Sequence, residues 1–138
     1  MKSKAVVNVD PFIIVVNVHV LDHQIIIDKP NVPIPWDFHG IVRWQIDGPD
    51  DAAFDPAAGV KFQVDNAPFT PYRVSAKVWE MDVRNTNNAV VSIPFKYTLN
   101  LTDGNAVIVD DPTVENDSPP KPVARRVRRP RRNARARV

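Results

Sequence analysis

The residues with the clearest capacity for chemistry lie in VIVDDPTVEND, residues 107–117, where two aspartates precede a proline. The Asp111 carboxylate can attack its own carbonyl carbon, form a cyclic anhydride and expel the nitrogen of Pro112, which is more basic than an ordinary amide nitrogen. At neutral pH this cleavage needs a second carboxyl group, from Asp110, Glu115 or Asp117, to protonate the leaving nitrogen. Adjacent residues on a strand point to opposite faces, so Asp110 can pair with Asp111 only if the strand has ended. The stretch predicts either a self-cleaving aspartic peptidase site or, as we favour, a strand end followed by a solvated turn.

Other familiar catalytic motifs are absent from the 138 residues. With four glycines and no cysteine, the chain has no GxGxxG fingerprint, no P-loop, no GxSxG elbow and no thiolate nucleophile. The three histidines, His19, His23 and His39, do not share a helical face, and a blue-copper centre needs a cysteine thiolate. We therefore expect no metal and no other cofactor, and we expect the histidines to face solvent on strands and loops.

The elements that would position these residues are short strands, because apolar residues recur at every second position. In residues 41–47 the apolar face includes Trp44, which we predict to lie in the core. The same alternation occurs in residues 16–20, 60–64 and 95–101. Weaker candidates, each rich in valine or isoleucine, are residues 5–9, 24–27, 74–83, 89–93 and 106–109.

Two further tryptophans are harder to place from the alternation. Trp79 falls on the same face as Ser75 and Lys77, so it is either exposed as a contact surface or part of a strand covered on both faces. Trp36, in PIPWDF, is expected in a loop that covers one end of the domain.

The connecting segments favour an all-β protein. DKPNVPIPWD, DGPDDAAFDPAAG, DNAPFTPY and RNTNN are clusters of proline, asparagine and aspartate that are typical of turns. Asp103-Gly104 predicts a hairpin between residues 97–101 and 106–109. No segment combines helical spacing with caps. We predict one domain over residues 1–117, a small Greek-key sandwich or barrel of the immunoglobulin or cupredoxin type.

The order of these segments resembles the small bacterial DP-EP family. The resemblance rests on VRWQI, GVKF, YTLNL, a DG turn, a short strand and DPTVEN, and it covers most of residues 1–117. Asp111-Pro112 matches the first pair of the family name, whereas Glu115 is followed by Asn116 instead of proline. The resemblance implies a compact all-β domain of largely unassigned function, for which an aspartic peptidase or self-cleaving role is suspected.

The charge is divided sharply along the chain. Residues 1–118 contain nine lysines and arginines against sixteen acidic residues, a formal charge of −7, whereas residues 119–138 contain nine basic residues and no acid, +9. Few apolar residues, several prolines and dense like charge predict a disordered tail over residues 118–138. The predicted polyanion-binding residues are Lys121, Arg125, Arg126, Arg128, Arg129, Arg131, Arg132, Arg135 and Arg137.

The partner expected for this tail is nucleic acid or another polyanion. Arginine side chains match phosphate geometry, and each phosphate contact releases a counterion, so binding depends on salt. No aromatic residues alternate with the arginines, which argues against sequence-specific recognition. An alternative partner is the acidic body of the same chain.

The remaining sequence features narrow the class of protein. No apolar run is long enough for a membrane span, and the N-terminus lacks the apolar stretch of a signal peptide, so we expect a cytoplasmic protein. The sequence is compatible with a homo-oligomer as well as with a monomer. We expect a non-enzymatic binding or structural protein whose tail binds polyanions, with a self-processing aspartic peptidase cleaving at Asp111-Pro112 as the alternative.

Overall fold

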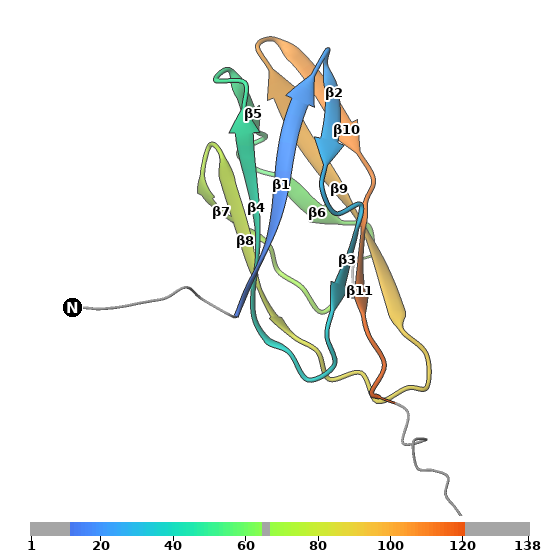
Figure 1. Cartoon of the computed structure of the whole chain (residues 1–138). Coiled ribbons are helices and arrows are strands. Elements are labelled where there is room, and N and C mark those ends of the chain that lie inside the picture. Colours follow the sequence, from blue (N-terminus) through green and yellow to red (C-terminus); the bar gives the residue numbers. More distant parts are fainter. Residues whose placement is uncertain (1–11, 65–66, 121–138) are drawn as a thin grey trace, which may run out of the picture.

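The described residues form two β-sheets packed face to face (Figure 1). The structure is a computed structural model that describes residues 12–64 and 67–120. In chain order its strands are β1 (Ile13–Leu21), β2 (Gln24–Ile27), β3 (Asn31–Ile34), β4 (His39–Gly48), β5 (Ala52–Phe54), β6 (Val60–Phe62), β7 (Tyr72–Ser75), β8 (Val78–Arg84), β9 (Ile93–Asp103), β10 (Ala106–Asp110) and β11 (Thr113–Asn116). The predicted all-β class is confirmed, and of the two architectures expected the described part forms the sandwich. No helix in this part is long and apolar enough to cross a membrane.

Both sheets are mixed. The first has the order β2-β1-β4-β8-β7, and the second has the order β10-β9-β11-β3. β5 and β6 also pair with β9, on the side away from β10 and β11, because β5 and β10 oppose the same stretch of β9. The pairs β1 with β4 and β11 with β3 are parallel, whereas the other pairs are antiparallel. The chain therefore passes between the sheets several times.

The core lies between the two sheets and follows the predicted alternation. The apolar faces of β1, β4 and β9 point inward, and Trp44 and Tyr97 are each 0% exposed. The Trp44 Nε1–H donates a hydrogen bond to the Tyr97 hydroxyl at 2.9 Å, and the two rings pack edge to face with centroids 5.3 Å apart. Burying such large side chains supplies much of the stabilisation of a small domain. The core prediction for Trp44 is confirmed.

Tight turns join two of the hairpins. Between β1 and β2, Asp22 and His23 have φ angles of 53° and 58°, the backbone that a two-residue type I′ turn needs. Between β9 and β10, Gly104 has a φ of 63°, which glycine adopts at no steric cost. The hairpin predicted from Asp103-Gly104 is confirmed.

The prediction of a single strand over residues 74–83 is wrong. This segment contains the end of β7, a turn at Ala76 and Lys77, and most of β8. The turn resets the alternation, so Trp79 shares a face with Met81 and Val83 and not with the residues before the turn. Trp79 is only 4% exposed and packs in the core, whereas Trp36, in the turn between β3 and β4, is 42% exposed.

Three strands lie in segments that the sequence predicted as connectors or a turn. β3 and β5 fall inside the proline- and aspartate-rich linkers, and β11 occupies the stretch expected to be a solvated turn. Conversely, residues 89–92 are not a strand, and β6 ends before the predicted limit of residues 60–64. The strand predicted over residues 5–9 lies outside the described residues.

Candidate functional site

The aspartate-proline stretch lies where the chain passes from one strand to the next within the second sheet. β10 ends at Asp110, and the Asp110 Oδ1 atom accepts a hydrogen bond from the Asp111 backbone N–H at 2.9 Å. The Asp111 Oδ1 atom accepts one from the Gln63 side-chain amide at 3.1 Å and lies 3.5 Å from the Thr98 hydroxyl. Pro112 is buried, and its carbonyl accepts the Tyr97 N–H at 3.0 Å. The carboxylate of Asp111 is thus held by neutral donors.

Glu115 does not reach this carboxylate. It lies opposite Pro94 in the ladder between β11 and β9, and its Oε1 atom accepts a hydrogen bond from the Asn31 side-chain amide at 3.2 Å. Pro94 and Thr98 are four residues apart on β9, which corresponds to about 13 Å at 3.3 Å per residue. The structure therefore brings Asp110 and Asp111 together through a backbone contact and keeps Glu115 apart from both. No shared-proton carboxylate pair results.

The turn predicted for residues 112–117 is wrong. β11 is an inner strand that pairs with β9 on one side and β3 on the other, and Val114 is fully buried. A cut at Asp111-Pro112 would therefore leave the C-terminal part attached through two ladders of backbone hydrogen bonds. Cleavage of this bond would therefore not by itself release the C-terminal part from the sandwich.

Asp110 is instead close to the core tyrosine. Burial raises the pKa of the Tyr97 phenol well above its usual value of 10.0, the hydrogen bond from Trp44 opposes this, and the negative charge of Asp110 adds to it. Tyr97 therefore stays a neutral phenol at neutral pH and serves the core as a hydrogen-bond acceptor.

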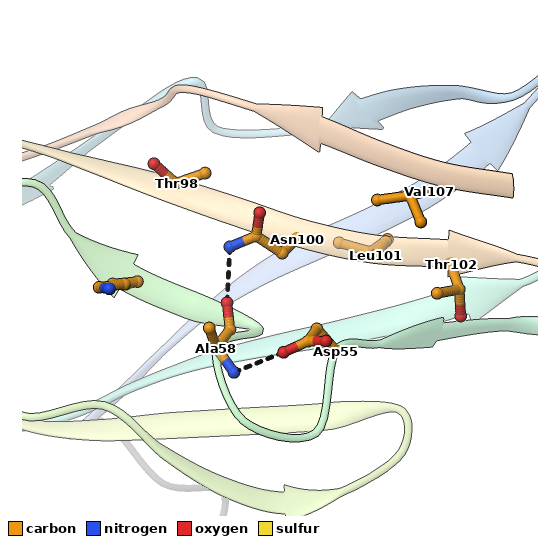
Figure 2. A pocket seen from close by; sticks show the side chains of 8 residues that line it. Asp55, Ala58, Thr98, Asn100, Leu101, Thr102 and Val107 are labelled. Carbon is orange, nitrogen blue, oxygen red and sulfur yellow. Dashed lines mark hydrogen bonds between the residues drawn. The ribbon is translucent and has the colours of Figure 1, made fainter.

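A pocket of about 450 Å³ lies on the outer face of the second sheet (Figure 2). Strand β9 forms its floor, β6 and the segment between β5 and β6 form one wall, and β10 forms the other. Its lining residues are Asp55, Ala58, Lys61, Thr98, Asn100, Leu101, Thr102 and Val107. Thr98 belongs both to this lining and to the surroundings of Asp111.

Two side chains shape the wall between β5 and β6. The Asp55 Oδ2 atom accepts the backbone N–H groups of Ala57 and Ala58 at 3.1 and 2.7 Å, which closes the turn. The Asn100 Nδ2 group donates to the Ala58 carbonyl at 2.7 Å and ties the turn to β9 (Figure 2). The pocket wall is therefore fixed by hydrogen bonds from both of its sides.

This pocket was not predicted from the sequence, although the polar residues of its floor are visible there as one face of a strand. The polar face of residues 95–101 includes Thr98 and Asn100, which both lie on its floor. Asp55, Lys61 and Val107 come from segments that only the strand register brings together. The register itself could not be derived from the alternation of side chains.

Two of the three histidines each pair with a single carboxylate. The Nδ1 atoms of His19 and His23 lie 2.8 Å from Asp47 and Asp103, respectively, and His39 lies at the start of β4. Within residues 12–64 and 67–120 no group of three or more histidine and acidic side chains could hold a metal ion.

The predicted polyanion-binding residues, from Lys121 to Arg137, lie outside the described residues. Just before them, the chain is anchored at the end of β11. The Asp117 N–H donates to the Ile34 carbonyl at 3.0 Å, and the Asn85 side-chain amide donates to the Asp117 carbonyl at 3.0 Å. The described chain therefore leaves the sandwich at a fixed point, at the end away from the β9–β10 turn (Figure 1).

The basic side chains of the described sandwich do not form one binding surface. Arg43 pairs with Glu80 at 2.6 Å, and Lys77 donates its ammonium protons to backbone carbonyls. Four basic side chains have no hydrogen bond or ion pair to a described residue and are divided between the two sheets: Lys61 on β6, Lys96 on β9, Arg73 on β7 and Arg84 on β8.

Comparison with protein-family models and curated proteins identified no relative of this chain. No protein-family model matches the chain, and no curated protein matches it significantly.

Proposed function

We propose that this is a non-enzymatic binding protein whose basic segment, residues 119–138, binds nucleic acid or another polyanion while the sandwich carries it. The observation that supports the proposal most directly is the division of charge, −7 over residues 1–118 and +9 over residues 119–138. Such a segment attracts phosphate chains through counterion release, without base readout.

The sandwich itself is poorly suited to bind a polyanion. Its free basic side chains are divided between two sheets, and its acidic residues outnumber its basic ones. A phosphate chain approaching either sheet would meet net repulsion, which salt screens beyond about 10 Å. Affinity for polyanions would then come from the basic segment, while the acidic sandwich would repel the same polyanions or compete with them for that segment.

The peptidase alternative receives less support from the geometry. Asp111 is held by Gln63 and Thr98, and the candidate proton donor Glu115 is bonded to Asn31 in the next strand. The resemblance to the DP-EP family rests on sequence motifs, and we keep kinship with that family as a proposal that agrees with the all-β fold.

The test is binding of duplex DNA and of heparin as a function of salt. If five to eight of the nine cationic side chains reach phosphates, the slope of log K against log salt on duplex DNA is about −4.5 to −7. Truncation after Asp117 should abolish the binding, because the shortened chain keeps the acidic sandwich and loses the cations.

Two further variants sharpen this experiment. Lys96→Met removes a free cation from the sandwich and serves as the matched control, with an expected change in slope of less than about one. Replacing all arginines of the segment with lysine should weaken binding modestly if point charge dominates and severely if bidentate contacts do. Equal affinity of the truncated and full chains would overturn the proposal.

A further inference from the structure

The pocket on the outer face of the second sheet has the features of a small-molecule site that is separate from the basic segment. Its volume of about 450 Å³ falls in the range of ligand pockets, about 300 to 1,000 Å³. Its floor is the middle of β9, which is paired on both sides, so the base of the pocket is rigid. The turn between β5 and β6 is tied to that floor through Asn100.

Several polar groups in the pocket have hydrogen-bond donors or acceptors that are not used within the described part of the protein. The side chains of Lys61 and Thr102 make no hydrogen bond or ion pair with a described residue. Asp55 uses its Oδ2 atom for the turn, which leaves Oδ1, and Asn100 uses its Nδ2 group, which leaves its carbonyl oxygen. The pocket thus offers an ammonium group, a hydroxyl and two acceptor oxygens around one space.

The balance of these groups argues against a phosphate or a nucleotide. Lys61 is the only cation among the lining residues, and the carboxylate of Asp55 lies in the same pocket. Asp111, beside Thr98, adds a second negative charge at its edge. None of the lining residues is aromatic, so a nucleobase would find no stacking partner.

A neutral polyhydroxylated ligand fits the same groups better. Each hydroxyl of a sugar both donates and accepts hydrogen bonds, so it can use the donors of Lys61 and Thr102 together with the acceptors of Asp55 and Asn100. Val107, a residue that is 75% exposed, gives an apolar contact for the C–H face of a ring. We propose that this pocket binds a neutral saccharide of one or two rings.

The affinity expected of this site is low. The pocket is open on the outer face of the sheet and lacks an aromatic platform, so a dissociation constant on the order of 1 mM is expected. Because the ligand is neutral, this binding should change little between low and high salt, unlike the binding of polyanions. A negative result for sugar binding would therefore leave the proposal of polyanion binding intact, and the reverse also holds.

The test is a titration of the full chain, labelled with ¹⁵N, with glucose, galactose, N-acetylglucosamine and maltose. Saturable amide shifts are expected from at least one of these sugars, centred on residues 55–61, 98–102 and 107. Lys61→Met, which keeps an unbranched side chain one atom shorter and removes the ammonium group, should weaken that binding about tenfold. Lys96→Met makes the same change at the outward position of β9 next to Thr98, outside the pocket lining. It should alter the affinity for the sugar less than about twofold.

A second variant and two competing ligands make the result decisive. Thr102→Val replaces the hydroxyl with a methyl group of similar size and should also weaken the binding, while the spectrum of each variant reports whether it is folded. Absence of shifts with all four sugars at 100 mM would overturn the proposal, as would equal effects of Lys61→Met and Lys96→Met. Stronger shifts at the same amides with inorganic phosphate or adenosine monophosphate would also overturn it and assign an anion site.

Discussion

Replacing Tyr97 with phenylalanine should destabilise the sandwich by about 1–3 kcal/mol. The substitution removes one oxygen atom and leaves the ring, so the loss of apolar packing is small. The hydroxyl is the acceptor for the Trp44 indole N–H, and both side chains are 0% exposed. Without it, a buried donor is left unsatisfied, and desolvation of such a donor costs about that amount. At about 4 °C per kcal/mol for a domain of this size, the midpoint of thermal unfolding should fall by about 4–12 °C.

Tyr72→Phe provides the matched control for this prediction. Tyr72 lies on β7 at the edge of the first sheet, is 40% exposed, and its hydroxyl lies 3.4 Å from a Glu80 oxygen. The same loss of one oxygen should change stability by less than about 0.5 kcal/mol there, because water replaces the lost contact. Urea and thermal unfolding of both variants measure the difference. A cost for Tyr97→Phe no larger than that for Tyr72→Phe would refute the assignment of the hydrogen bond as a core contact.

Two further predictions concern aspartates. Burial acts to raise the pKa of Asp28, but hydrogen bonds from the side chain and backbone of Asn17 outweigh it and hold the pKa below its usual 3.8. The ionised form therefore stabilises the fold above about pH 4, and this contribution is lost as the pH falls through the lowered pKa. Asp28→Asn should then be less stable than the unchanged chain at pH 7, with a smaller difference at pH 3 in urea unfolding, and a difference independent of pH would contradict the linkage. The intact mass of the chain should stay constant for days at pH 5 and pH 7, whereas a C-terminal fragment beginning at Pro112, absent from Asp111→Asn, would revive the peptidase alternative.

Long regular alternation made most of the fold predictable. In β4 and β9 the inward residues recur over nearly the whole strand, so the sequence pattern was sufficient to place Trp44 in the core. The β9–β10 hairpin was predictable from Asp103-Gly104, because Gly104 can adopt the positive φ that the turn requires. These features are local, since each depends on neighbouring residues in the chain.

The strands that were missed depend on distant residues instead. β3 and β11 are four residues long, and the parallel ladder between them joins Asn31 to Thr113. Pro33 lies within β3, and proline is common at strand edges and in loops alike. A four-residue segment buries only two side chains on one face, too few for its alternation to be distinguished from a linker. The strand face predicted for Trp79 was wrong for a different reason. The two-residue turn at Ala76 and Lys77 shifts the alternation of inward and outward residues, and the sequence pattern did not reveal that turn.

The place of β11 changes what the aspartate-proline stretch can do. As an inner strand, it fixes Pro112 in the sheet, turns Asp111 toward the outer face and holds the chain as far as Asp117. The carboxylate chemistry inferred from the sequence requires a proton donor near Pro112, and the ladder places Glu115 about 13 Å from Asp111. Nearness in the sequence suggested a catalytic pair, but the extended backbone of a strand is the conformation that separates such residues most. What the strand brings together instead is Asp111 and Thr98, at the edge of the outer pocket, so this stretch bears more directly on the lining of that pocket than on cleavage of the chain.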